Sequence, residues 1–211
     1  MVAPEPELEL AWQRHIGGDQ RLLDGLLARH REKQRRYHTA THVAWVIRHV
    51  EELGAVEPVD HLDEVVAAAF YHDAVYEPTH PANERASARL ARRDLTTLGW
   101  SDDRTERVGS MIEATAHQGP DASSGDTSIL LDADLAILAA DPAGYSDYVS
   151  GVRAEYRHLD DDEWRTGRTS VLEAFVDRTS IYSTPTARER WEPRARANIA
   201  AELAALARGL S

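Results

Sequence analysis

A histidine and an aspartate that can both bind a metal ion follow directly after an apolar stretch of the chain. The apolar residues before them recur at helical spacing: Leu62, Val65, Val66, Ala69 and Phe70. One further turn places His72 and Asp73 where apolar residues are expected, and a buried carboxylate needs a compensating partner such as a metal ion. Consecutive helical side chains diverge by about 100°, so both can approach one ion. The alternative is an ordinary helix end, where both side chains meet water.

Three other segments carry side chains of the same kind next to apolar stripes. His42 borders the stripe of Val43 and Val46, Asp134 shares a helical face with leucines, and His117 ends a helix. Each alone fits a core or capping residue. Together, histidine and carboxylate ligands suit one divalent transition metal, namely Mn, Fe, Co, Ni or Zn, with Mg also compatible.

His38 and His42 have the i, i+4 spacing of the zinc-peptidase pattern H-E-x-x-H. The residue after His38 is Thr39, so the glutamate that serves as general base in those enzymes is missing. A peptidase is therefore disfavoured.

Composition narrows the classes of partner. The net charge of −12 argues against nucleic acid or an anionic membrane as the main partner. The absence of cysteine excludes thiolate zinc sites and a cysteine nucleophile. No apolar run has the length of a membrane span and the N-terminus lacks the features of a secretory signal, so we expect a cytoplasmic protein. A homodimer is compatible with these features.

The pattern of apolar residues predicts an all-α protein. We expect helices near residues 6–16, 19–34, 43–53, 62–76, 83–98, 102–117, 130–140, 143–157, 161–179 and 186–210. Asn83 is expected to cap the fifth of them, and Asp141 the eighth, with Pro142 at its first position. We expect one domain over 1–211, with an N-terminal helical extension (1–18), a metal-site core (37–140) and C-terminal helices (141–211).

The ordered residues His42, His72-Asp73 and Asp134 resemble the HD superfamily of metal-dependent phosphohydrolases. The strings YHTATH, FYHDAVY, NERASA, TAHQ, LDADLAIL and GRTSVLEAFVDRTSIY resemble a bacterial branch of predicted HD phosphohydrolases, from about residue 37 to 200. The resemblance implies an HD-domain-like helical fold and one metal held by His42, His72, Asp73 and Asp134. It also implies a small phosphorylated substrate, with a nucleotide as the leading candidate.

The same resemblance suggests further roles. Glu84 would transfer the proton, and Asp73 and His38 would also contribute to catalysis. His117, Arg178 and Tyr182 would contact the substrate. For Glu84 the alternative is a first-turn residue that favours the helix dipole; for the histidines it is capping, and for the arginine a surface ion pair. Phosphate also needs cations, and the candidates are Arg35, Arg36, Arg153, Arg157, Arg168 and Arg178.

Two aspartates compete for the last ligand position. On a helix Asp132 and Asp134 point about 200° apart, so one metal cannot easily take both. Asp134 shares the leucine face, so we expect it to be the ligand and Asp132 to stay solvated or cap the helix. Two other functions stay open: a regulatory HD module that binds a nucleotide or metal with little turnover, and a di-iron HD-type oxygenase, which needs more ligands.

Overall fold

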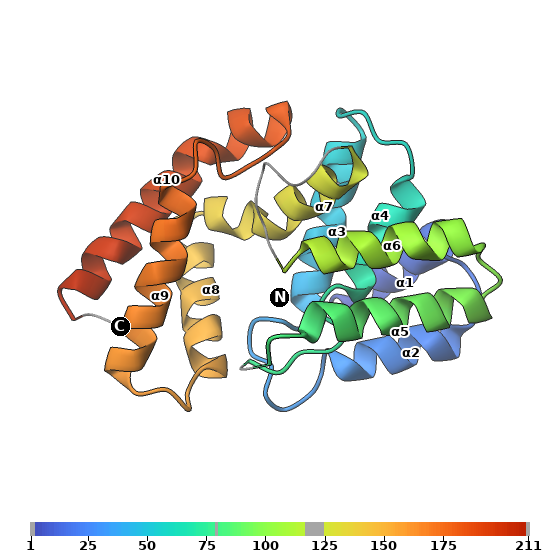
Figure 1. The fold of residues 1–211 in the computed structure, drawn as a ribbon, viewed down its shortest axis with the longest axis horizontal. Coiled ribbons are helices and arrows are strands. Elements are labelled where there is room, and N and C mark those ends of the chain that lie inside the picture. The colour runs from blue at the N-terminus through green and yellow to red at the C-terminus, as the bar shows by residue number, and fades with distance from the viewer. Residues whose placement is uncertain (1–2, 79, 117–124, 210–211) are drawn as a thin grey trace.

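A computed structural model of the chain describes residues 3–78, 80–116 and 125–209. Most of these residues lie in helices. This part contains ten α-helices, one 3₁₀ helix and no strand, which confirms the all-α prediction (Figure 1). They are α1 (Glu5–His15), α2 (Gln20–Arg29), α3 (Ala40–Gly54), α4 (Leu62–Tyr71), α5 (Asn83–Thr97), α6 (Asp102–Ala114), α7 (Asp126–Leu135), η2 (Ala136–Ala139), α8 (Pro142–Glu155), α9 (Asp161–Val176) and α10 (Pro185–Ala207).

Helix α4 lies at the centre of the core. Its residues from Val65 to Phe70 are all apolar and fully buried, as expected of a helix that is surrounded on every side. Helices α1, α3, α5, α6 and α7 pack around it. Helix α1 belongs to this core as well, because Leu8 and Trp12 are fully buried and the Trp12 ring meets Phe70 edge to face at 5.3 Å. The N-terminal helix is thus packed into the domain.

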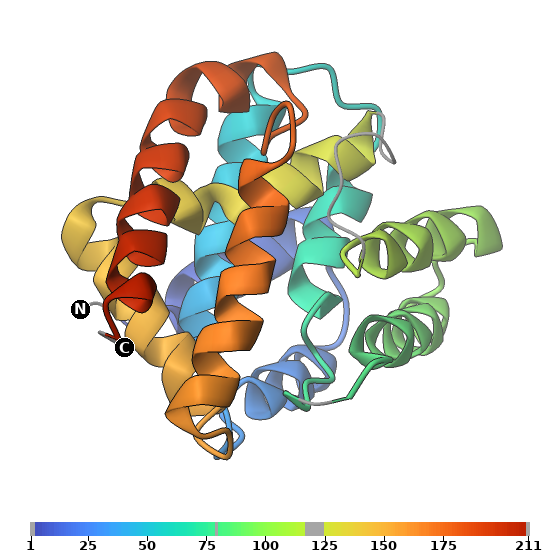
Figure 2. The same cartoon turned by 60° about the vertical axis from the view of Figure 1, so that its left-hand side comes forward.

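Two groups of helices flank this centre. Helices α5 and α6 form a pair on one side, and α8, α9 and α10 lie on the other (Figures 1 and 2). A buried ion pair between Arg168 and Glu202, with Nε to Oε1 at 2.7 Å, joins α9 to α10. Asn198 ties α10 to η2 by donating to the carbonyls of Leu138 and Ala140. Among the described residues, no helix has both the length and the apolar character that crossing a bilayer requires.

Several helix ends differ from the sequence prediction. Helix α4 ends at Tyr71, so His72 is its C-cap rather than part of a continued stripe. Asn83 does not cap α5: it is the first helical residue, and its side chain bonds to the backbone N–H and carbonyl of Glu77. The prediction for Asp141 is confirmed, because its carboxylate accepts from Gly144 N at 2.9 Å and Pro142 opens α8.

Candidate metal centre

Three packed helices bring the predicted ligands together. His42 lies in the first turn of α3, His72 and Asp73 follow the last residue of α4, and Asp134 lies in the last turn of α7. Helices α3, α4 and α7 are mutual neighbours. The ends of α4 and α7 therefore meet the start of α3, and side chains distant in the sequence converge there.

The ligand atoms of His42, His72 and Asp134 lie within 4.8 Å of one another. The Nε2 atoms of His42 and His72 are 3.1 Å apart. Asp134 Oδ1 lies 3.3 Å from His42 Nε2 and 3.6 Å from His72 Nε2. Asp73 Oδ2 approaches the same two nitrogens, at 3.4 Å and 3.1 Å. This group of His42, His72, Asp73 and Asp134 is called the His–Asp cluster below.

These separations fit a shared metal ion. Ligand atoms about 2.0–2.2 Å from one ion, at angles of about 90–110°, lie about 2.8–3.6 Å from each other. The five distances within the His–Asp cluster fall in or next to that range. His72 Nδ1 donates to the Ala69 carbonyl at 2.9 Å, so Nε2 is the ring nitrogen that faces the cluster. Within the described chain, His42 Nδ1 is buried without a hydrogen-bond partner.

Charges in the His–Asp cluster stabilise one another. Burial lowers the pKa of His42 and His72, but the carboxylates of Asp134 and Asp73 outweigh it, so both values are raised. Burial would raise the pKa of Asp73 and Asp134, but the two histidines outweigh it, so both carboxyl groups have a lowered pKa. The carboxylates are thus ionised, which is the form that binds a cation.

Asp132 has a different role from the one that the sequence suggested. It is buried rather than solvated, and its carboxylate accepts from Ser183 N at 2.8 Å and Thr184 N at 2.7 Å. Burial raises the pKa of this carboxyl group. Asp132 therefore fixes the start of α10, whereas Asp134 points to the histidines.

A second carboxylate fixes the segment that carries His38. The side chain of Glu155, on α8, is completely buried, and its Oε1 accepts from the backbone N–H groups of Arg36, Tyr37 and His38 at 2.7, 2.8 and 3.0 Å. Its Oε2 accepts from His38 Nδ1 at 2.6 Å and from the Tyr76 hydroxyl at 2.9 Å. Burial opposes ionisation, but these donors lower the pKa of Glu155 to about 2.

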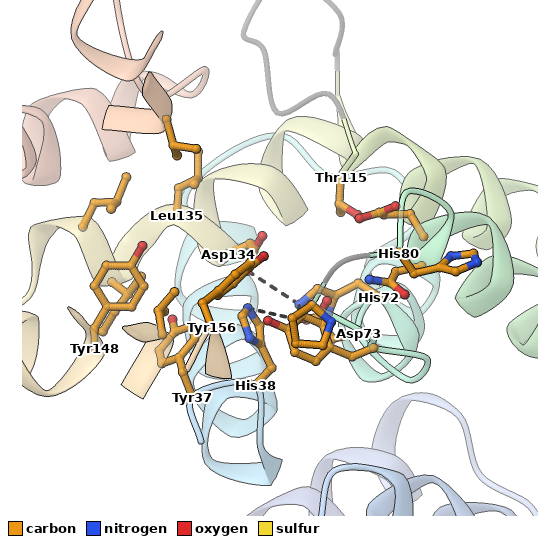
Figure 3. Close-up of a pocket in the computed structure, with 18 of the residues that line it drawn as sticks. Tyr37, His38, His72, Asp73, His80, Thr115, Asp134, Leu135, Tyr148 and Tyr156 are labelled. Atoms are coloured by element: carbon orange, nitrogen blue, oxygen red, sulfur yellow. Dashed lines mark ion pairs between the residues drawn. The ribbon is translucent and has the colours of Figure 1, made fainter. Parts of the chain in front are cut away.

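The His–Asp cluster opens into a cavity of about 330 Å³. Figure 3 shows His38, His72, Asp73 and Asp134 pointing toward one another, with Tyr148 on one side and Thr115 and His80 on the other. The lining residues are Tyr37, His38, His72, Asp73, Tyr76, Pro78, His80, Asn83, Glu84, Thr115, Asp134, Leu135, Ile137, Leu138, Tyr148, Val152, Tyr156, Val171 and Phe175. Among the described residues, no arginine or lysine lines it.

Some of the other predicted site residues line the cavity and some do not. Glu84 and His38 line the cavity, and His38 Nε2 lies 4.0 Å from Asp73 Oδ2. Tyr182 does not line it, because its ring is fully buried and its hydroxyl donates to the Leu135 carbonyl at 3.1 Å. Arg178 does not line it either; its guanidinium stacks on Phe175 at 4.6 Å. His117 lies outside the described residues.

Two of the candidate phosphate-binding arginines have other partners. Arg35 is buried and donates to the carbonyls of His38, Asp73 and Ala74. Arg168 pairs with Glu202 and donates to the Tyr148 hydroxyl at 3.0 Å. Both position residues around the cavity without reaching into it.

Sequence reasoning missed Glu155 and the aromatic residues that line the cavity, namely Tyr148, Tyr156 and Phe175. Glu155 is three residues after Val152, which is also buried, so helical spacing placed it on an inward face. Its partners are 79 to 119 residues earlier in the chain, where periodicity gives no signal.

Comparison of the chain with protein-family models, curated proteins and solved structures finds no match.

Proposed function

We propose that the chain is a metal-dependent phosphohydrolase of the HD type that acts on a small phosphate ester such as a nucleotide. The observation that carries the proposal is the His–Asp cluster. The ligand atoms of His42, His72 and Asp134 lie within 4.8 Å of one another, Asp73 Oδ2 lies 3.4 Å and 3.1 Å from the Nε2 atoms of the two histidines, and the cluster opens into a cavity. The resemblance of the strings around these residues to HD phosphohydrolases supports the same assignment.

His42, His72, Asp73 and Asp134 would hold one divalent metal. When bound, such an ion lowers the pKa of water and polarises a phosphoryl oxygen, which is the chemistry that hydrolysis of a phosphate ester requires. The carboxylates of Asp73 and Asp134 match Mn or Mg, and the imidazoles match Fe, Co, Ni or Zn.

Two side chains of the cavity are candidates for moving the proton. Glu84 lines the cavity at the first turn of α5. His38 also lines it, and the bond from its Nδ1 to Glu155 leaves Nε2 directed toward Asp73. Either group can accept a proton from the attacking water or donate one to the leaving oxygen.

The test is a screen of the purified protein against phosphorylated metabolites with added Mn, Co, Ni or Mg. We expect phosphate release that depends on the metal, together with about one metal per chain on the same sample. An Asp134→Asn variant is the control, because it removes a ligand of the His–Asp cluster. Turnover that is equal in this variant, or absent from the whole panel, would refute the proposal.

A binding module without turnover is the second candidate. It is favoured by one observation: in the part of the chain that the structure describes, the cavity lacks the arginine or lysine that often clamps a phosphate. Tight binding of metal and a nucleotide, without phosphate release from any member of the panel, distinguishes this function from the first. Two irons per chain would instead support an oxygenase.

A further inference from the structure

The lining of the cavity has polar and apolar parts that come from different helices. Figure 3 shows Asp73, His72 and Asp134 in the middle, between Tyr148 on one side and Thr115 and His80 on the other. Apolar side chains from η2, α8 and α9 form one part of the lining, called the apolar end below: Ile137, Leu138, Val152, Val171 and Phe175. A ligand bound at the His–Asp cluster that extends toward α8 and α9 would therefore meet apolar side chains.

Val171 extends the apolar end to the surface. This valine is 50% exposed although it lines the cavity, and Phe175 follows it one turn later on the same face of α9. Tyr148 and Tyr156 line the cavity as well, so aromatic rings form part of its wall. Aromatic rings pack favourably against other rings, edge to face or offset. The wall therefore suits a flat or apolar group.

The charge in the cavity limits how many phosphates a ligand can carry. Among the described residues, three carboxylates line it, those of Asp73, Asp134 and Glu84, and no arginine or lysine does. The residues outside the described part contain no arginine or lysine either. The two charges of a divalent metal are already offset by Asp73 and Asp134. Each phosphate beyond the first would thus add negative charge without a cationic side chain to meet it.

The volume of the cavity also favours a ligand with a single phosphate. At about 330 Å³ the cavity is at the small end of the range for ligand sites, about 300–1,000 Å³. A ligand with one phosphate and a compact body fits this space better than one with a chain of phosphates.

We infer that the substrate is a phosphate monoester with a single phosphate and an aromatic or apolar body, and that esters of di- and triphosphate are rejected. This inference rests on the proposed function. Val171 and Phe175 would contact the body, and the His–Asp cluster with its metal would bind the phosphate.

Binding tests the inference without any need for turnover. Metal-loaded protein is titrated by calorimetry with phenylphosphonate and with methylphosphonate, which share a head group and are not hydrolysed. We expect phenylphosphonate to bind at least about tenfold more tightly, as burial of a ring gives. Val171→Asn should weaken phenylphosphonate at least about threefold and leave methylphosphonate unchanged.

Val176→Asn is the matched control. Val176 is also an exposed valine of α9, but it does not line the cavity. It should leave both affinities unchanged. Equal affinity for the two phosphonates, no binding of either, or equal effects of the two substitutions would each overturn the inference.

Turnover separates this inference from the proposed function. Adenosine mono-, di- and triphosphate are compared at a fixed concentration of free metal, and kcat/KM should fall at least tenfold from the mono- to the diphosphate. A preference for the triphosphate overturns the inference and keeps the phosphohydrolase. Selective binding of phenylphosphonate with no turnover of any ester supports the ligand class and overturns the phosphohydrolase.

Discussion

Asp132 and Asp134 are two residues apart in α7, yet their carboxylates have unrelated partners. Asp132 accepts from the two backbone N–H groups before α10, and Asp134 faces His42 and His72. The helical angle between them, about 200°, separates the two faces. One carboxylate thus holds the segment before α10, and the other belongs to the His–Asp cluster.

Substitution of each by asparagine should separate these roles. Asp134→Asn should lose bound metal, because an amide is a weaker ligand for a cation than a carboxylate. Asp132→Asn should keep the metal but lower the free energy of unfolding by about 1–3 kcal/mol, since the amide cannot accept both bonds. Metal content per chain and urea unfolding measure the two effects. Loss of metal in the Asp132 variant alone would reverse the assignment.

The buried side chain of His30 should make the stability of the fold depend on pH. Only 1% of it is exposed, and neither ring nitrogen has a hydrogen-bond partner in the described residues. Burial, with the charge of Arg35, lowers its pKa from 6.5 to about 3. Below pH 6.5 His30 is protonated in the unfolded chain but stays neutral in the folded chain. His30 therefore lowers the free energy of unfolding by about 1.4 kcal/mol for each further pH unit, down to about pH 3.

His30→Leu should remove this contribution. The free energy of unfolding should then fall less steeply with acidity than in the natural chain, and the gap between the two should widen by about 1.4 kcal/mol per unit below pH 6. Urea unfolding at pH 7, 6, 5 and 4 measures both profiles. Parallel profiles would mean that His30 is protonated in the folded protein.

At the scale of elements, the packing of α8 against the loop before α3 forms one side of the cavity. Gly151 allows this contact, because a Cβ on it would lie 3.1 Å from Tyr37 Cβ. Gly167, in α9, has nothing within 4 Å of such an atom. The first glycine is therefore needed for packing and the second is not.

The two glycines give opposite predictions. Gly151→Val should lower the free energy of unfolding by about 1–3 kcal/mol, since the added methyl groups must displace Tyr37 or α8. Gly167→Ala should raise it by about 0.5–1 kcal/mol, because alanine favours the helix. Urea unfolding of both variants measures these two changes. Stabilisation by both substitutions would show that α8 is not tightly packed on Tyr37.

The elements were predictable from sequence to the extent that their signals are local. Apolar spacing gave the ten helices, and Asp141-Pro142 gave the start of α8. Long-range partners were not predictable. Asn83 bonds to Glu77 instead of capping α5, and Asp132 accepts from backbone N–H groups 51 and 52 positions later. Arg35 was one of several candidates to bind phosphate, with a surface ion pair as the alternative, but its guanidinium donates to backbone carbonyls.

For the whole molecule, the His–Asp cluster joins three helices that are far apart in the sequence. A bound metal would therefore stabilise the folded state, by about 2.7 kcal/mol at a free concentration of 100 times Kd. For a chain of this length this corresponds to an increase in Tm of about 5–10 °C.

Thermal unfolding with and without Mn²⁺ measures the shift, and a chelator should reverse it. Asp134→Asn should show no shift at the same concentration, because its cluster lacks one carboxylate. An equal shift in this variant would mean that the stabilising ion binds elsewhere.

The bonds of Glu155 bear on how the protein is made. The candidate metal ligands end at Asp134, whereas the carboxylate that holds residues 36–38 comes later, at Glu155. At about 5–20 residues per second, the ribosome adds this interval in about 1–4 s. During that time three backbone N–H groups beside His42 have no carboxylate to accept them. We therefore expect the growing chain to contain all its candidate metal ligands before this wall of its cavity is fixed, so a metal that binds them could do so during synthesis.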